Sequence, residues 1–265
     1  MSSERRVIVH PDKEALCGSV AARFITKVVD LIHEFGEASI VLTGGSVGIA
    51  VLAAINDSPA RDSVDWSRVN VWWGDERWLA SGDPERNEVQ ARAALLDHLA
   101  FDPARVHAFA ASDQGLELDE AAAAYAAEIR DHAPRNAAFP HFDITFLGMG
   151  PDGHVASLFP ERGGVRETEL LVISVRNSPK PPPERLSLTL PVINSCARVW
   201  FVLAGADKAS ALGLTLAGAS LIEVPAAGVR GRRKTLFFVD AAAAAEVPET
   251  LIDPGEFWTG ADETA

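Results

Sequence analysis

The chain has 265 residues, of which 48% are apolar and 23% are charged, and this is the composition of an ordinary globular protein with a full core. Its formal net charge of −13 argues against nucleic acid as a partner, because neutralising phosphates needs a clustered excess of Lys and Arg. No stretch approaches the ~18 apolar residues that a membrane span needs, and residues 1–10 lack the apolar centre of a signal peptide. We therefore expect a cytoplasmic protein without membrane contact, folded as a single domain over residues 1–265.

Seven short runs of β-branched and aromatic residues predict strands. Most of these runs are continuously apolar, which is typical of strands buried on both faces of a largely parallel sheet. Helices must then cover both faces of that sheet. The predicted strands are residues 7–9, 39–43, 69–73, 142–147, 170–175, 199–203 and 235–239.

Apolar residues between these strands recur with helical spacing. One stripe covers residues 16–32, and another covers residues 118–129. A further helix is predicted over residues 83–99, with Asp83 as its cap and Pro84 in its first turn. The alternation of strands and helices predicts a doubly wound α/β fold, in which a largely parallel sheet carries helices on both faces. Folds of this kind bind ligands at the carboxyl ends of their strands.

Gly44, Gly45 and Ser46 stand between the strand at residues 39–43 and a predicted helix. Glycines let the backbone approach a ligand closely, and the free N–H groups at a helix start point toward an anion, so this segment favours a phosphate site. Two alternatives stay open. One is a turn without a ligand, and the other is a serine-hydrolase nucleophile elbow, because residues 44–48 match Gly-x-Ser-x-Gly. The elbow ranks low, since no Asp and His pair stands out as partners of the serine.

Asp75, Glu76 and Arg77 follow Gly74 at the end of the strand at residues 69–73. The guanidinium offers a fork for an oxyanion, and the carboxylates offer acceptors for sugar hydroxyls, so the segment can address a carbohydrate. The alternative is a solvated loop with local ion pairs, since such tetrads are common.

The glycine-rich segment at residues 148–154 is the most informative one. His154 follows a strand end, and Asp152 lies two residues before it. Histidine changes its charge near neutral pH, so His154 can take a proton from water while Asp152 orients it or a substrate hydroxyl. The segment therefore predicts a general base for hydrolysis, with a structural histidine in a tight turn as the alternative.

Residues 148–153 also contain the Gly-x-Gly-x-x-Gly spacing of a dinucleotide-binding loop. Such a loop opens a full crossover helix, whereas only residues 155–159 precede a proline here, and Arg176 replaces the acidic residue expected after the next strand. These departures argue against a nicotinamide cofactor. Cys17 and Cys196 lack zinc-site spacing as well, so we expect neither a redox cofactor nor a metal.

Three basic residues, Lys180, Arg185 and Lys208, are candidates to supply the positive potential that an anionic substrate needs in an acidic protein. Taken singly, each is a common surface charge. The later cluster at residues 230–234 is either a rim of the same pocket or a solvated loop before the last strand, and we favour the loop.

Together these segments resemble the 6-phosphogluconolactonase family, and the similarity runs along nearly the whole chain. The most specific match is residues 147–160, which resemble the family's signature around its general base. Supporting matches are residues 73–77, Asn87 and residues 178–189, in the same order along the chain. One departure is Val47-Gly48, where Thr-Pro is usual, and another is residues 78–80, where the family has Val-Pro.

The resemblance implies the fold shared with glucosamine-6-phosphate deaminase. It also implies hydrolysis of 6-phospho-D-glucono-1,5-lactone to 6-phosphogluconate in the oxidative pentose phosphate pathway, with His154 as the general base. Asp152, Asp75 and Arg77 are the other expected catalytic residues, and Arg77 or the glycine-loop N–H groups stabilise the oxyanion. The expected phosphate ligands are Ser46, Arg185, Lys208 and the backbone of Gly44 and Gly45.

The expected partner is thus a small sugar-phosphate lactone, with functional coupling to glucose-6-phosphate dehydrogenase as a further expectation. Two rivals remain besides the serine esterase. One is a sugar-phosphate deaminase or isomerase of the same fold, and the other is a sugar-phosphate sensor that binds without turnover.

Overall fold

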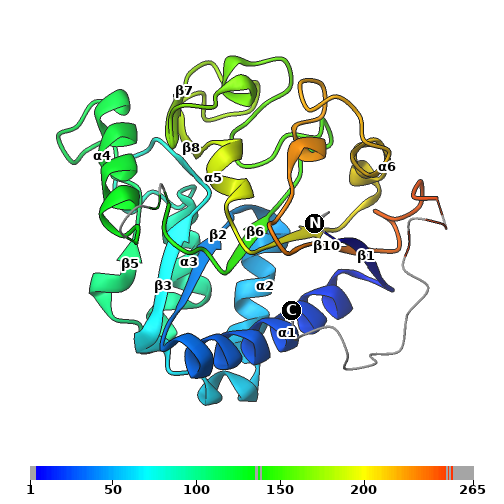
Figure 1. Cartoon of the computed structure of the whole chain (residues 1–265), viewed down its shortest axis with the longest axis horizontal. Helices are drawn as coiled ribbons and strands as arrows, with labels where there is room; N and C mark the ends of the chain where they lie inside the picture. The colour runs from blue at the N-terminus through cyan, green and yellow to red at the C-terminus, as the bar shows by residue number, and fades with distance from the viewer. Residues whose placement is uncertain (1–3, 135–136, 138, 249, 251, 253–265) are drawn as a thin grey trace.

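The computed structural model describes residues 4–134, 137, 139–248, 250 and 252, and Figure 1 traces the chain through them. The predicted single domain over residues 1–265 reaches beyond these ranges and stays a prediction. The strands are β1 (Glu4–His10), β2 (Ala38–Leu42), β3 (Val69–Trp73), β4 (Asp75–Arg77), β5 (Val106–His107), β6 (Ile144–Leu147), β7 (Val172–Val175), β8 (Arg185–Leu188), β9 (Arg198–Leu203) and β10 (Lys234–Asp240). The α-helices are α1 (Lys13–Phe35), α2 (Gly45–Asp57), α3 (Asn87–Ala94), α4 (Leu118–Asp131), α5 (Leu190–Asn194) and α6 (Ala209–Leu216).

Seven of these strands form one parallel sheet, in the order β1-β10-β9-β6-β2-β3-β5. Its central strands are buried on both faces. All of β6 is buried, and β9 is buried after its first residue. This confirms the largely parallel sheet predicted from continuous apolar runs. β5 was not predicted, because two residues are too few to give a pattern.

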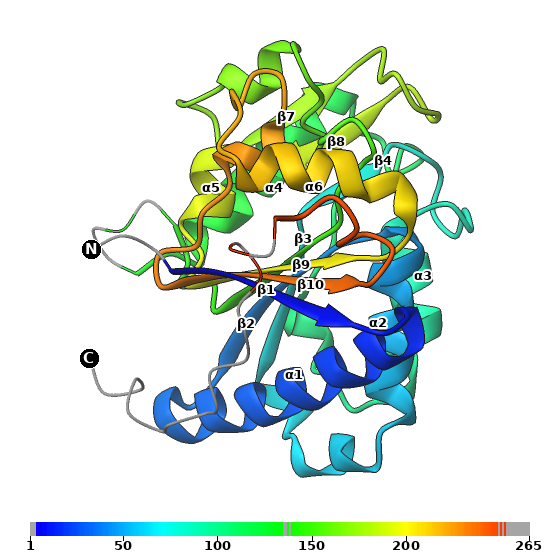
Figure 2. The ribbon, with the colours of Figure 1, turned by 90° about the vertical axis from the view of Figure 1, so that its right-hand side faces the viewer.

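Helices cover both faces of the parallel sheet, with α1 and α2 on one side and α5 and α6 on the other (Figure 2). α1 follows the predicted apolar stripe. The carboxylate of Asp12 accepts a hydrogen bond from the N–H of Ala15 at 2.8 Å, and Gly36 ends the helix with a φ of +83°. The chain therefore has the doubly wound α/β fold that the sequence predicts. No helix in the described part of the chain is both long and apolar enough to cross a membrane.

β4, β8 and β7 form a separate antiparallel sheet, on the same side of the parallel sheet as α5 and α6. Two expectations are corrected here: residues 75–77 form a strand and not a loop, and the strand predicted at residues 170–175 is β7, outside the parallel sheet. β7 has only its first residue buried, which does not suit a central parallel strand. The N–H of Leu188 donates to the carbonyl of Gly74 at 2.9 Å, so this small sheet is joined to the parallel sheet where β3 ends.

The helix start predicted at Asp83 is wrong. Asp83 and Pro84 form a turn, in which the Asp83 carboxylate accepts the backbone N–H two residues on, and α3 begins only at Asn87. The carboxylate of Glu76 on β4 accepts the first N–H groups of α3, from Asn87 at 2.7 Å and from Glu88 at 2.9 Å. Because the capping residue lies on β4, the sequence next to the start of α3 contains no capping residue that would predict where the helix begins.

Candidate active site

Loops that the sequence singled out meet at one edge of the parallel sheet. They follow β2, β3, β6 and β9, which are neighbours in the order β9-β6-β2-β3 and run in the same direction. Their carboxyl ends lie side by side, where sheets of this kind bind ligands. The N–H of Gly148 also donates to the hydroxyl of Thr43 at 3.4 Å, which links the loops after β6 and β2. The residues brought to this edge are Gly44, Gly45, Ser46, Asp75, Asp152, His154 and Lys208.

His154 and Asp152 form a hydrogen-bonded pair at this edge. Nδ1 of His154 lies 2.5 Å from Oδ1 of Asp152. The His154 ring packs on the ring of Phe159, with 4.6 Å between the ring centres, and 16% of the side chain is exposed. Because Nδ1 is engaged by the carboxylate, Nε2 is the nitrogen left for a water or a substrate. A histidine held in this way suits a general base.

The charges around Asp152 keep it ionised. Burial raises its pKa, but the hydrogen bond and charge of His154 and the ammonium of Lys180 outweigh burial and hold the pKa of Asp152 well below its usual range. Nζ of Lys180 lies 3.6 Å from Oδ1 of Asp152 and 3.5 Å from Nδ1 of His154. The predicted basic residue Lys180 therefore belongs to the same cluster.

A tight turn holds the pair against the backbone of Gly150. The N–H of Gly150 donates to the carbonyl of His154, and the N–H of Gly153 donates to the carbonyl of Gly150, both at 2.9 Å. A Cβ atom at Gly150 would lie 2.0 Å from Nδ1 of His154 and 2.3 Å from Oδ1 of Asp152, so only glycine fits there. Gly153 has a φ of +79°, in the left-handed region that glycine tolerates. Gly150 therefore leaves room for the His154–Asp152 pair, and Gly153 allows the turn that places it.

The segment after β6 does not have the form of a dinucleotide-binding loop. Residues 148–160 form turns and one isolated bridge between Val155 and Leu158, and the next helical element is a short 3-10 helix at Gly163–Arg166. A dinucleotide loop opens a crossover helix directly. The structure therefore contradicts the dinucleotide-binding alternative.

Gly44, Gly45 and Ser46 open α2 at the carboxyl edge. Gly44 is the cap residue, and Gly45 is the first helical residue with a φ of +82°, so the unpaired N–H groups of the first turn lie at this edge. Ser46 is exposed, and its hydroxyl forms no hydrogen bond with any residue that the structure describes, so it lacks the histidine partner of a nucleophile elbow. A Cβ at Gly48 would lie 2.8 Å from the carbonyl oxygen of Thr43.

Asp75 and Arg77 lie on β4, and the alternative of a solvated loop is wrong. Asp75 is 6% exposed, and its Oδ2 accepts a hydrogen bond from Oγ of Ser157 at 2.8 Å. Nη1 of Arg77 donates to the carbonyl of Glu85, and β4 pairs Arg77 with Arg185 of β8. The bond to Ser157 ties β4 to the segment that carries His154.

The expectation that Glu76 offers an acceptor to a sugar hydroxyl is wrong, because its carboxylate is buried and caps α3, a role that sequence reasoning missed. Its side chain is 1% exposed, and besides capping α3 its carboxylate accepts the N–H of Arg77 at 2.8 Å. Nη2 of Arg86 lies 3.8 Å from Oε2 of Glu76. Burial raises the pKa of Glu76 to about 7, against the lowering effects of Arg86 and of the N–H donors. The only sequence signal was its place in the Asp-Glu-Arg motif, which did not separate it from Asp75.

Replacing Glu76 with glutamine should change how stability depends on pH. A carboxyl group whose pKa is raised by folding binds more protons in the folded state, so the free energy of unfolding of the wild type falls as pH rises from about 4.5 to about 7, by up to about 3 kcal/mol. Glu76→Gln lacks this proton and should lose this part of the slope. Denaturant titrations of both proteins at about pH 5 and about pH 8 measure the difference, and equal slopes would contradict the assignment.

Arg185 holds the loop that presents Lys180. It is 6% exposed, and its Nε and Nη2 donate to the carbonyls of Pro182 and Pro181 at 3.1 and 2.8 Å. Its guanidinium carbon lies 5.8 Å from the centre of the Phe159 ring, on which His154 also packs. Arg185 and His154 therefore contact the same aromatic ring, and Arg185 also holds the loop whose Lys180 contacts the pair.

Lys208 stands after β9, just before α6. Its Nζ lies 2.9 Å from Oδ2 of Asp207, and 21% of its side chain is exposed. The turn before it is fixed by Gly205, whose N–H donates to the carboxylate of Asp240 at 3.1 Å. Lys208 is thus a partly accessible cation at the carboxyl edge, on the opposite flank of β6 from Gly44.

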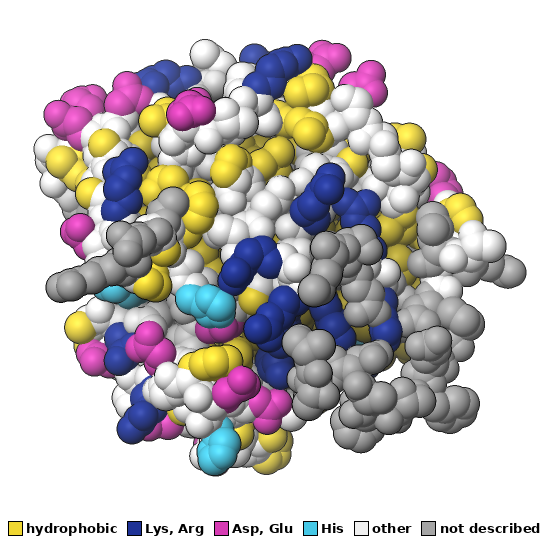
Figure 3. Space-filling model, viewed as in Figure 1, with side chains coloured by type: hydrophobic (Ala, Val, Ile, Leu, Met, Phe, Trp, Pro, Cys, Tyr) yellow, Lys and Arg dark blue, Asp and Glu magenta, His cyan; other side chains and the backbone are white. Residues whose placement is uncertain are grey.

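The basic cluster at residues 230–234 lies at the other edge of the sheet. These residues precede β10, which runs parallel to β9, so they stand at the amino ends of the strands. The N–H of Arg230 donates to Oδ1 of Asn194 at 2.9 Å, and Nε of Arg232 donates to the carbonyl of Ser195 at 2.7 Å. Figure 3 looks onto this face and shows Lys and Arg side chains gathered where β1 and β10 begin. The cluster is not a rim of the candidate site.

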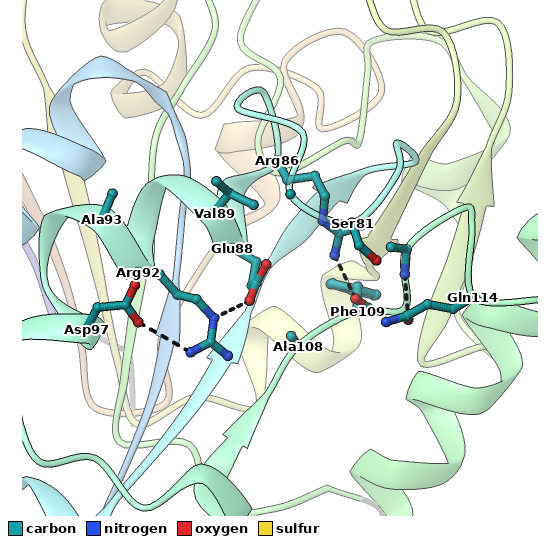
Figure 4. Close-up of a pocket in the computed structure, with 12 residues that line it drawn as sticks. Ser81, Arg86, Glu88, Val89, Arg92, Ala93, Asp97, Ala108, Phe109 and Gln114 are labelled. Atoms are coloured by element: carbon teal, nitrogen blue, oxygen red, sulfur yellow. Dashed lines mark hydrogen bonds and ion pairs between the residues drawn. The ribbon is translucent and has the colours of Figure 1, made fainter.

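A cavity of about 480 Å³ lies beside α3 and is drawn in Figure 4 with Arg86 among its lining residues. None of the predicted site residues lines it. A smaller cavity, of about 200 Å³, adjoins the site, because Ser157, Phe159 and the two residues before Lys180 line it.

The fold and the site define an α/β protein that can bind an anion at a helix start and move a proton at the His154–Asp152 pair. The family model for glucosamine-6-phosphate isomerases/6-phosphogluconolactonase matches residues 11–238. The chain belongs to this family, which confirms the resemblance found in its sequence.

Two bacterial relatives match over nearly their whole length. The 6-phosphogluconolactonase of Streptomyces coelicolor is 55% identical over 258 residues, which cover 96% of this chain and 99% of the relative. That of Mycobacterium tuberculosis is 42% identical over 242 residues, which cover 91% of this chain and 97% of the relative. Among solved structures, the 6-phosphogluconolactonase of Thermotoga maritima has a TM-score of 0.77 at 27% identity, covering 89% of this chain and 100% of that one.

Proposed function

We propose that the protein hydrolyses 6-phospho-D-glucono-1,5-lactone to 6-phosphogluconate. The observation that carries the proposal is the His154–Asp152 pair, 2.5 Å apart, at the same sheet edge as the open start of α2. The relatives from Streptomyces coelicolor and Mycobacterium tuberculosis, both 6-phosphogluconolactonases at 42% identity or more, support the choice of substrate.

His154 acts as the general base in the proposed reaction. A water at Nε2 attacks C1 of the lactone, His154 takes its proton, and the ionised Asp152 stabilises the imidazolium. The imidazolium returns that proton to the ring oxygen as the C1–O bond breaks. The oxyanion is stabilised by Arg77 or by an N–H group of residues 148–153 other than those of Gly148, Gly150 and Gly153, which already donate within the protein. Each well-placed donor contributes about 3 kcal/mol.

The phosphate binds at the start of α2 in this proposal, on the backbone of Gly44 and Gly45 and on the hydroxyl of Ser46. Lys208 and Arg185 supply the positive charge. Nη1 of Arg185 forms no hydrogen bond to the described residues, which leaves it for a phosphate oxygen. Anchoring the remote phosphate lets binding energy orient the lactone at His154.

Replacing Lys208 with alanine should raise KM and leave kcat within a few-fold. A charge-assisted hydrogen bond contributes about 1.5–3 kcal/mol, so KM for the phosphorylated lactone should rise about 10- to 100-fold. Arg233→Ala is the matched control, because Arg233 is an exposed cation at the opposite edge and should leave KM unchanged. An unchanged KM in Lys208→Ala would remove Lys208 from the phosphate site.

Parallel assays separate the proposal from its rivals. Acid release from freshly prepared 6-phosphogluconolactone should exceed the spontaneous rate in proportion to enzyme concentration, and glucosamine 6-phosphate should release no ammonia. Ammonia release would favour the deaminase instead. Saturable binding of 6-phosphogluconate without any acceleration would favour the sensor.

We further propose that the protein works in the cytoplasm on lactone supplied by glucose-6-phosphate dehydrogenase. The net charge of −13 suits a small metabolite better than a polyanionic partner. In a mixture with that dehydrogenase, adding the protein should raise the rate of acid formation and lower the standing lactone concentration. An unchanged lactone concentration would contradict the coupling.

A further inference from the structure

Asn87 is the first residue of α3. It connects β4 to residues 44–46, which are called the phosphate loop because the substrate phosphate is proposed to bind there. Its side chain is buried, with 2% of the residue exposed. Nδ2 donates to the backbone carbonyl of Asp75 at 2.8 Å and lies 3.5 Å from Oδ1 of the same residue. On its other side the carboxamide packs against Gly44, where a Cβ atom would lie 1.9 Å from Oδ1 of Asn87. One side chain therefore touches both the proposed phosphate site and a proposed catalytic carboxylate.

Two buried side chains, Glu76 and Arg86, fix the position of Asn87. The Glu76 carboxylate accepts its backbone N–H at 2.7 Å, and Arg86 faces that carboxylate. Arg86 is fixed in turn, because its Nη2 donates to the carbonyl of Phe109 at 2.8 Å, as Figure 4 shows. Breaking either contact would remove a hydrogen bond from a buried side chain, which is unfavourable. The start of α3 is thus a fixed point between residues 44–46 and β4.

The contacts of Asn87 do not serve core stability alone. Its Oδ1 is buried and has no hydrogen-bond partner among the described residues. An unpaired buried oxygen of this kind costs about 1–3 kcal/mol, and an apolar side chain of the same shape would avoid that cost. The amide of Asn87 instead acts as a spacer of defined shape. It donates a hydrogen bond to Asp75 on one side and packs against Gly44 on the other.

We propose that Asn87 is a positioning residue that sets the distance between the phosphate loop and Asp75, and so couples phosphate binding to the orientation of the lactone at His154. The inference rests on the proposed function. A misplacement of about 1 Å can lower a rate about 100-fold. The effect must depend on the phosphate, because a lactone without one does not engage the loop at Gly44.

The test compares two substrates in two variants. Asn87→Ala should lower kcat/KM about 10- to 100-fold for 6-phosphogluconolactone, through both kcat and KM, and by less than about threefold for unphosphorylated glucono-1,5-lactone. Asn194→Ala is the matched control. Its Nδ2 donates to the carbonyl of Gly228 at 3.0 Å and its Oδ1 accepts the N–H of Arg230 at 2.9 Å, so it makes similar contacts at the opposite edge. It should leave both rates unchanged.

Equal losses on both lactones in Asn87→Ala would show a merely structural role, and no loss on either would show no role. A second variant tests the contact itself. Gly44→Ala places its Cβ against Asn87, so adding Asn87→Ala should recover part of the lost activity. A double variant no better than Gly44→Ala would overturn the contact.

If the proposed function is wrong, the wild-type protein will not accelerate lactone opening. The role of Asn87 is then tested by calorimetry, which measures the affinities for 6-phosphogluconate and for inorganic phosphate. Asn87→Ala should weaken the binding of 6-phosphogluconate about tenfold and leave the binding of inorganic phosphate unchanged. Only 6-phosphogluconate is long enough to reach from the phosphate loop to the His154–Asp152 pair. Equal changes for the two ligands, or no binding of 6-phosphogluconate by the wild type, would overturn the inference.

Discussion

His154→Ala should lose nearly all catalysis while it still binds the product. A general base contributes about 10²- to 10⁴-fold, so kcat for 6-phosphogluconolactone should fall by about that factor. The imidazole contacts Asp152, Lys180 and Phe159, and no described contact joins it to the phosphate loop. Affinity for 6-phosphogluconate, measured by calorimetry, should therefore stay within a few-fold of the wild type.

The control for this variant is His98→Ala. His98 is exposed, and its Nε2 lies 2.9 Å from the carbonyl of Ala93, away from the sheet edge that carries the site. It should keep the kcat of the wild type. Turnover by His154→Ala within about fivefold of the wild type would mean that another group takes the proton from water.

Gly150→Ala should be almost as damaging, although it removes no functional group. The added Cβ would lie within 2.3 Å of both Nδ1 of His154 and Oδ1 of Asp152, so the pair must move. Because a displacement of about 1 Å can lower a rate about 100-fold, kcat should fall at least about 100-fold. Rate assays measure this loss, and thermal unfolding monitors the fold.

Gly18→Ala is the matched control for that substitution. Gly18 lies inside α1 with nothing within 4 Å of the position of an added Cβ. Alanine there should stabilise the helix by about 0.5–1 kcal/mol and leave kcat unchanged. A Gly150→Ala protein with the kcat of the wild type would show that the turn does not fix the geometry of the base.

The parallel sheet and the meeting of its loops could be predicted from the sequence. Continuous apolar runs mark strands buried on both faces, and parallel strands deliver their carboxyl ends to one edge. Asp152 is two residues from His154, and the glycines around them mark a special backbone, so the sequence indicated that Asp152 orients either His154 or a substrate hydroxyl. The structure places Nδ1 of His154 2.5 Å from Oδ1 of Asp152, and the catalytic role of the pair stays a prediction.

The small antiparallel sheet and the role of Glu76 could not be predicted in the same way. Residues 75–77 are a strand because they pair with β8, more than a hundred residues later in the chain. Glu76 caps a helix that begins beyond the local turn at Asp83, so the polar residues near that turn suggested a false start. Both features depend on tertiary contacts, which propensity and spacing do not record.

The decay of freshly prepared 6-phosphogluconolactone with wild-type protein in a chelating buffer, corrected for spontaneous opening, tests whether His154 drives lactone hydrolysis. The rate should rise in proportion to protein concentration, persist in the chelator and fall to the spontaneous value with His154→Ala. A wild-type rate equal to the spontaneous one would contradict the lactonase, and a rate lost in the chelator would contradict a mechanism carried by His154 and its neighbours alone.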